Sequence, residues 1–196
     1  MSLISPFFWL FGYLSGSLPF ALWITRLVKG IDVRDGGSGH ITTTNTIRQA
    51  GWIPGVAVFL LDFSKGFVPV YLAQRAGLPA WSIGLTGALA VAGHCWPVFA
   101  QFRGGMGLAV TAGILMAVSI LGFLLSFATL LFFVLILHHG ARGSLVAGLA
   151  AAPLLWLVGL RGTVIWLAVG AGIVIVIRFT VDWNRKYREL WLDRQR

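Results

Sequence analysis

The sequence contains few charged residues and a single cysteine. Charged side chains make up 11% of its 196 residues, and six of them are Asp or Glu. A soluble domain carries roughly 25% charged residues, so this composition excludes an ordinary soluble protein. One cysteine, Cys95, cannot form a disulfide within the chain and is typical of a small buried apolar residue.

Long apolar runs take the place of the missing charge, and 58% of the residues are hydrophobic. A run of about 20 apolar residues can cross a bilayer as a helix. We therefore predict an all-α, polytopic membrane protein with seven transmembrane helices in a single domain over residues 1–196. The expected spans are residues 3–25, 53–74, 80–100, 106–120, 121–137, 144–160 and 162–178.

The division of residues 106–137 into two spans rests on length and on Ser119. One straight helix over this stretch would rise roughly 48 Å, well beyond a hydrocarbon core of about 30 Å. Two short helices joined by a tight turn fit the membrane better.

The distribution of Lys and Arg predicts the orientation. Twelve of the fifteen lie on one side of the predicted spans. By the positive-inside rule that side is cytoplasmic, the N-terminus is outside and the C-terminus is cytoplasmic. Residues 26–52 then form a long cytoplasmic substrate loop and residues 179–196 a basic cytoplasmic tail. Membrane topology thus explains the net charge of +9 without nucleic acid as a partner.

Polar residues gather in four segments on the same predicted side, at residues 32–48, 94–107, 138–144 and 178–188. The loops expected on the other side are short and plain. This segregation favours a functional site at the cytoplasmic end of the helices.

The segment 101–113 reads QFRGGMGLAVTAG. Gly104, Gly105 and Gly107 allow a tight turn before an apolar helix, whose N-terminus favours a phosphate. Arg103 adds a charged hydrogen-bond donor. The alternative is a flexible membrane loop in which Arg103 reaches the lipid surface.

The segment 37–48 reads GSGHITTTNTIR and carries hydroxyl and amide groups suited to a polyol phosphate. Ser38, His40 and Asn45 are candidate catalytic or orienting residues, and Arg48 is a candidate anion ligand. The alternative is a polar connector, although connectors in compact domains are usually much shorter.

The remaining candidates lie singly or in pairs. Asp62 and Lys65, three residues apart within an apolar span, can pair on one helix face. His94 ends another span and is either a base or a packing residue. Arg142 and Ser144 are candidates for an anion pocket. We predict no metal site, because no zinc-type spacing occurs.

Many of these residues occur in one order along the chain. The series is Gly16-Ser17-Leu18-Pro19-Phe20, Gly30, Asp32, Arg34, Gly37-Ser38-Gly39, Thr44-Asn45, Arg48, Gly51, Asp62, Lys65-Gly66, Gly93-His94, Pro97, Phe99, Phe102, Gly104-Gly105 and Gly107. This order resembles the bacterial acyl-phosphate:glycerol-3-phosphate acyltransferase family, from Gly16 to about Arg185.

The resemblance implies a seven-span protein of the bacterial inner membrane with its active site on the cytoplasmic side. It implies transfer of a fatty acyl group from acyl phosphate to the 1-hydroxyl of glycerol 3-phosphate, in phospholipid biosynthesis, without cofactor or metal. Arg48 and the 103–107 turn would then hold phosphates. Ser38 and Asn45 would orient the acceptor.

Other roles follow from the same resemblance. Lys65 and Arg142 would join the phosphate ligands, with His40 and His94 among the catalytic candidates. Supporting residues would be Asp32, Arg34, Asp62, Ser144 and Asp182. The acyl chain would lie between the spans, against lipid.

Several positions depart from the family pattern. Met106 stands where the pattern has the second Lys of F-K-G-G-K-G, and Arg103 stands in place of the first. His40 replaces Asn, and Asp182 falls roughly where the pattern has Asn. Asp182 would repel a phosphate, unless it pairs with Arg103.

Two alternatives to the acyltransferase follow. One is a weakened or non-catalytic relative that acts on another polyol phosphate or as a partner of lipid enzymes. The other is an organic-phosphate transporter with Asp62 and Lys65 at its centre, but the inverted repeats typical of transporters are not evident.

Overall fold

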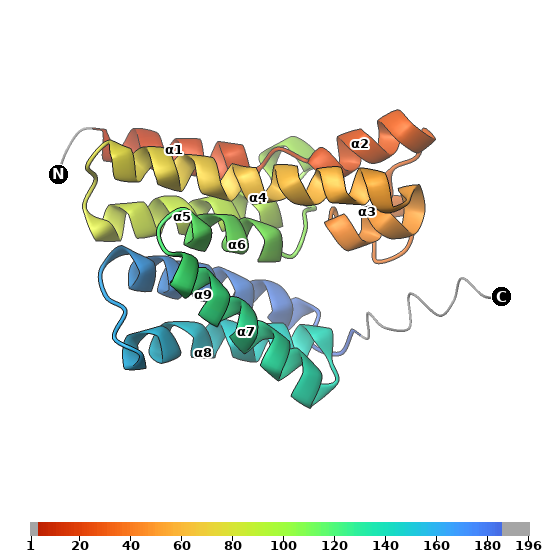
Figure 1. Ribbon diagram of the computed structural model, residues 1–196. Helices are drawn as coiled ribbons and strands as arrows, with labels where there is room; N and C mark the ends of the chain where they lie inside the picture. The colour runs from red at the N-terminus through yellow and green to blue at the C-terminus, as the bar shows by residue number, and fades with distance from the viewer. Residues whose placement is uncertain (1–3, 186–196) are drawn as a thin grey trace.

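The computed structural model describes residues 4–185, and these residues form helices and no strands (Figure 1). The helices are α1 (Ser5–Gly16), α2 (Phe20–Lys29), the 3-10 turn η1 (Val33–Asp35), α3 (Thr43–Ala50), α4 (Trp52–Arg75), α5 (Ala80–Cys95), the 3-10 turn η2 (Val98–Ala100), α6 (Leu108–Met116), α7 (Ile120–Leu137), α8 (Gly140–Leu157) and α9 (Thr163–Val181). The all-α prediction is confirmed. The start of the first expected span and residues 186–196 of the expected tail lie outside the described residues.

Six helical segments of the described chain are long and apolar enough to cross a membrane. The first runs from Ser5 to Lys29 and is interrupted at residues 17–19, between α1 and α2. The prediction had seven spans, and the remaining one corresponds to α6. With nine residues, α6 rises only about 14 Å, less than half of a bilayer core.

The predicted break near Ser119 is confirmed. α6 ends at Met116 and α7 begins at Ile120. The Ser119 hydroxyl caps α7 by accepting a hydrogen bond of 3.0 Å from the backbone N–H of Gly122. A serine at this position satisfies an amide at the helix N-terminus that has no partner within the helix.

Small residues bring the helices together. A Cβ built on Gly16 would lie 2.0 Å from the Ala90 carbonyl oxygen, and one on Gly93 would lie 2.2 Å from the Tyr13 carbonyl oxygen. Glycine therefore allows α1 and α5 to pack backbone to backbone, as is typical of membrane helices. The helix α7 is packed much less deeply, because Gly122 is the one buried residue among its 18. Its apolar outer face is therefore suited to contact with lipid.

The polar segments share one end of the helical bundle. In Figure 1 the α4–α5 and α8–α9 loops lie at the left end, near the N-terminus. α3, the segment between α5 and α6, the α7–α8 turn and the end of α9 lie toward the right. The clustering expected from the sequence is therefore present.

Candidate anion-binding site

Asn45 shapes the loop between η1 and α3 and is completely buried. Its Nδ2 donates to the carbonyls of Val33, Gly36 and His40 at 2.8, 3.1 and 3.0 Å. Its Oδ1 accepts from the Ser38 amide at 3.0 Å. Because the amide is used up inside the loop, Asn45 holds the backbone in shape. If Asn45 orients an acceptor, as predicted, it does so through the shape of this loop.

The glycine turn before α6 packs against the same loop. The Gly105 amide donates to the His94 carbonyl at 3.0 Å, and the Gly104 carbonyl accepts from the Ile41 amide at 3.4 Å. A Cβ on Gly105 would lie 2.1 Å from His94 Nε2 and 2.4 Å from the Ile41 oxygen. The turn therefore requires glycine there. Gly107, with φ +83°, is the N-cap of α6.

Arg178 of α9 joins the turn to the loop from the other side and is 8% exposed. Its Nε donates to the Gly105 carbonyl at 2.8 Å, and its Nη2 lies 3.2 Å from His40 Nδ1. Since a guanidinium can only donate, His40 Nδ1 accepts. In the neutral ring the proton is then on Nε2, which lies 2.8 Å from Asp182 Oδ2 and donates to it. Arg185 Nη1 also lies 3.0 Å from Nε2, but a protonated Nε2 cannot accept a hydrogen bond from it.

Asp182 and Arg185 complete this contact. Arg185 Nη1 lies 3.5 Å from the Asp182 carboxylate, and Arg185 Nη2 donates to the Ser38 carbonyl. Asp182 thus pairs with His40 and Arg185. The hypothesis of an ion pair between Asp182 and Arg103 is wrong for this structure, because the ion pairs of residues 4–185 do not include Arg103.

A hollow of about 290 Å³ lies beside these groups. Arg103 and Arg178 both line it, and no carboxylate does. Within residues 4–185 the Arg103 guanidinium makes no hydrogen bond or ion pair and therefore remains available to a ligand. The lining residues are Gly39, His40, Cys95, Trp96, Phe102, Arg103, Gly104 and Arg178. Two guanidinium groups facing one hollow can bind an anion such as phosphate.

A buried charge cluster supports the turn from α4. Lys65 Nζ lies 2.9 Å from Asp62 Oδ1 and donates to the Leu18 carbonyl at 2.7 Å. His94 Nδ1 lies 3.8 Å from the same carboxylate. Lys65 was predicted to bind phosphate, but its ammonium is buried and already paired. The predicted pairing of Asp62 with Lys65 is confirmed. The cluster joins α4 to α5 through His94 and to the α1–α2 junction through Leu18.

Two other predicted ligands lie elsewhere. The Arg142 guanidinium packs over the Trp183 ring at 5.2 Å and donates to Asn184 Oδ1 at 3.2 Å. Ser144 is buried and lines an apolar pocket. Neither residue is among those that line the hollow. That they join an anion pocket stays a prediction.

Asp32 and Arg34 brace the outer side of the loop. Arg34 Nη2 lies 2.7 Å from Asp32 Oδ2, and Arg26 reaches the same oxygen at 3.0 Å. The Arg34 hydrogen bonds lower the pKa of the Asp32 carboxyl to about 2. Arg34 also reaches the Ala100 carbonyl at 3.4 Å. The supporting role predicted for both residues fits this geometry.

Arg48 and Met106 are both buried at this end of the bundle. Arg48 is 4% exposed and its Cδ lies 3.7 Å from a Cβ built on Gly37. Met106 is 8% exposed and belongs to the apolar core. Its thioether thus packs inside the protein and does not line the hollow.

Sequence reasoning missed Arg178 and Arg185 as site residues, because it counted them only as cytoplasmic charges. Arg178 carried a usable signal. It stands at the end of an apolar span, where an ionisable residue usually faces a functional site or a polar partner. The contact between His40 and Asp182 joins residues 142 positions apart and leaves no signal in one sequence.

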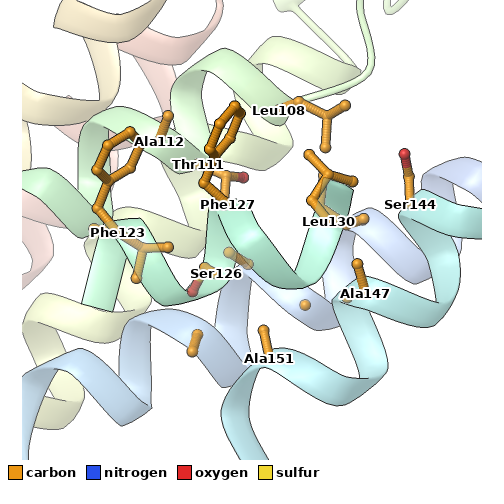
Figure 2. Close-up of a pocket in the computed structure, with 16 residues that line it drawn as sticks. Leu108, Thr111, Ala112, Phe123, Ser126, Phe127, Leu130, Ser144, Ala147 and Ala151 are labelled. Carbon is orange, nitrogen blue, oxygen red and sulfur yellow. The ribbon is translucent and has the colours of Figure 1, made fainter. Parts of the chain in front are cut away.

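An apolar pocket of about 80 Å³ begins beside the turn (Figure 2). Leu108, the residue after Gly107, lines one end of it. The pocket continues between α6, α7, α8 and α9 past Phe127, Leu130 and Ala151. Phe127 is 48% exposed, so the pocket reaches the lateral surface that faces lipid.

Together the fold and the site define a polytopic membrane protein with an arginine-lined hollow and an apolar pocket on either side of the glycine turn in sequence. A sequence profile of the family described as glycerol-3-phosphate acyltransferase matches residues 6–189. The chain belongs to this family. A glycerol-3-phosphate acyltransferase of Aquifex aeolicus is 38% identical over 177 residues, which cover 90% of this chain and 92% of that protein.

Further relatives agree. Glycerol-3-phosphate acyltransferase 5 of Dehalococcoides mccartyi is 34% identical over 194 residues, covering 95% of this chain and 82% of that protein. A similar solved structure is that of PlsY (YgiH), an integral membrane glycerol 3-phosphate acyltransferase, in its glycerol 3-phosphate form. It has a TM-score of 0.80 and 37% identity, and the match covers 92% of this chain and 90% of that one. PlsY is also known in a lysophosphatidic acid form.

Proposed function

We propose that this chain transfers a fatty acyl group from acyl phosphate to the 1-hydroxyl of glycerol 3-phosphate, releasing lysophosphatidic acid and phosphate. The observation that carries the proposal is the convergence of Arg103 and Arg178 on one hollow beside the glycine turn. Family membership and the glycerol 3-phosphate form of PlsY support the choice of acceptor.

The apolar pocket supports a fatty acyl group as the cargo. It starts one residue beyond the turn and is lined almost entirely by carbon. An acyl phosphate can therefore place its phosphate in the hollow and its chain between α6 and α9. This arrangement holds the reactive carbonyl at the boundary between the polar and apolar regions.

The chemistry asks little of the protein beyond positioning. Phosphate is already a good leaving group, so a covalent acyl-enzyme is not needed. Holding the acceptor hydroxyl and the acyl carbonyl next to each other lowers the entropic part of the barrier. The guanidinium groups of Arg103 and Arg178 stabilise the charge that develops on the departing phosphate. The Ser38 hydroxyl accepts a hydrogen bond of 3.4 Å from the His40 amide, and in this proposal it helps to orient the acceptor beside the hollow.

The cellular setting is part of the proposal. The polar end of the bundle carries most of the basic residues, which favours a cytoplasmic site in the bacterial inner membrane. Glycerol 3-phosphate would then enter from the cytoplasm, and the acyl donor and product would stay in the membrane. This setting suits an early step of phospholipid biosynthesis.

A second candidate is a weakened or non-catalytic relative, and Asp182 favours it. Its carboxylate lies 2.8 Å from His40 at the edge of the hollow and opposes a dianionic ligand. Such a protein would act on another polyol phosphate or serve as a partner of lipid enzymes.

The deciding experiment is phosphate release from palmitoyl phosphate by the purified protein, with and without glycerol 3-phosphate. We expect release that depends on the acceptor, together with lysophosphatidic acid as product. Arg161→Gln, at the opposite end of the bundle, is the matched control and should retain full activity. Absence of acceptor-dependent release from a folded sample would support the second candidate instead.

A further inference from the structure

The glycine turn lacks the second of the two cations that the family pattern provides. The pattern places Lys at the position of Met106, whereas the Met106 side chain is in the apolar core. A thioether cannot form a charged contact with phosphate, and such a contact is worth about 1.5–3 kcal/mol. Of the two cations that the pattern places in this turn, only the one at Arg103 is therefore present, and a phosphate here can gain a second cation only from another part of the chain.

Arg178 reaches the same turn from α9. Its Nε donates to the carbonyl of Gly105, the residue directly before Met106. Its Nη2 contacts His40, while its Nη1 makes no hydrogen bond within residues 4–185. Because Arg178 lines the hollow, this remaining nitrogen is a donor for a ligand there.

We propose that Arg178 is a phosphate-binding cation of the hollow beside the turn in which Met106 carries no charge, and that the His40–Asp182 pair positions it. The inference rests on the proposed function for the identity of the substrates. The anion contact itself follows from the geometry of the hollow.

The positioning works through the imidazole. Asp182 accepts the Nε2 proton of His40, and this leaves the Nδ1 lone pair pointing at Arg178. With its Nε on Gly105 and its Nη2 on His40, the guanidinium is held at two points and cannot turn away from the hollow. His40 and Asp182 both replace Asn of the family pattern, and in the structure they contact each other.

The groups that face His40 are consistent with this role. Arg178 comes from α9, Asp182 is the C-cap of that helix, and Arg185 follows it. Arg185 Nη1 also approaches Asp182, so the carboxylate is shared between a cation and the imidazole. The Asp182 charge is thereby partly neutralised, which reduces its repulsion of a phosphate.

The test uses inorganic phosphate as the probe, with its dissociation constant measured by calorimetry on the full-length protein in detergent. We expect Arg178→Gln to weaken binding by at least about tenfold. His40→Phe keeps a ring but removes the acceptor, and should weaken binding by a similar factor. His40→Asn keeps one donor and one acceptor and should stay within about threefold of the wild type.

Asp182→Asn decides between positioning and repulsion. If Asp182 positions His40, losing the charge-assisted bond weakens phosphate binding by about threefold. If the carboxylate chiefly repels the ligand, the substitution tightens binding. Phosphate affinity that is unchanged or improved in this variant would overturn the positioning role, and unchanged affinity in Arg178→Gln would overturn the proposal as a whole.

Two further readouts separate this inference from the proposed function and from misfolding. Arg161→Gln serves as the control, and each variant must keep its unfolding temperature. Where acyl transfer occurs, Arg178→Gln should raise the KM for the phosphate substrates by a larger factor than it lowers kcat. Where the wild type binds phosphate without acyl transfer, the proposed function fails while the binding series still decides the role of Arg178. A wild type that binds no phosphate contradicts the inference.

Discussion

At the scale of single residues, the site depends on glycines whose lack of a Cβ leaves room for close backbone contacts. The turn before α6 can pass between His94 and Ile41 because Gly105 has no Cβ. In this position the Gly105 carbonyl accepts a hydrogen bond of 2.8 Å from Arg178 Nε. A side chain at position 105 would collide with His94 and Ile41 and would displace this carbonyl. Close backbone approach therefore brings the cation to the hollow.

Gly105→Ala tests this close approach. The added methyl group would lie 2.1 Å from His94 Nε2, so we expect a loss of about 1–3 kcal/mol in stability. Phosphate binding should weaken in parallel, as the turn moves away from Arg178. Gly148→Ala is the control, since its Cβ comes no nearer than 3.2 Å to Ile175. Equal unfolding temperatures for the two variants would refute the argument.

At the scale of elements, charged residues fix how helices and loops sit on one another. Asp62 and Lys65 tie α4 to the α1–α2 junction through the Leu18 carbonyl, within an otherwise apolar span. Asp32 and Arg34 similarly hold the loop after α2. In both places the ion pair is local in sequence, whereas its structural effect is long-range.

Lys65→Met should be strongly destabilising, because it leaves the Asp62 carboxylate buried without its cation. Breaking a buried pair in this way costs about 3–5 kcal/mol. Asp62→Asn combined with Lys65→Met should recover much of that loss. The measurement is thermal unfolding in detergent across the four-protein cycle. Purely additive effects of the two substitutions would show that the pair is not coupled.

The Asp32 brace predicts a pH dependence. Its carboxyl has a pKa of about 2 in the folded protein, below the ordinary value of 3.8, so the folded state favours the ionised form. The stabilisation is complete above about pH 4 and is lost as the pH falls toward 2. The unfolding temperature of the wild type should exceed that of Asp32→Asn at neutral pH, and the difference should shrink in acid. A constant difference down to pH 2 would contradict this assignment.

Much of the element scale could be predicted from the sequence. Spacing alone predicted the Asp62–Lys65 pair, and length together with Ser119 predicted the break between α6 and α7. These features depend on residues near each other in the chain. The partners of Arg178 and the contact between His40 and Asp182 could not be predicted, since both depend on which helix and loop pack beside each other.

At the scale of the whole molecule, the bundle has a plain end and a polar end. The short α4–α5 and α8–α9 loops lie at the plain end (Figure 1). The segments that carry the hollow and its arginines lie at the polar end. A soluble substrate can meet the site from one side of the membrane only. The orientation of the bundle therefore decides which compartment supplies it.

Cysteine labelling tests the predicted orientation. Cys95 is buried, so the natural chain gives a low background to a membrane-impermeant maleimide. We expect Ala76→Cys, in the α4–α5 loop, to react in intact spheroplasts. Gln101→Cys, at the polar end, should react only after the membrane is opened. The reverse pattern would invert the topology and place the site outside.

The lateral opening of the apolar pocket beside Phe127 bears on how a product would leave. Lifting a sixteen-carbon chain into water costs about 13 kcal/mol at roughly 0.8 kcal/mol per methylene, which would make release extremely slow. A chain lying between α6 and α9 can instead slide sideways past α7 into the surrounding lipid. Its headgroup moves along the membrane surface, and the chain is never transferred to water. For a protein that makes such a product, the shallow burial of α7 would provide an exit route that avoids the cost of hydrating the chain.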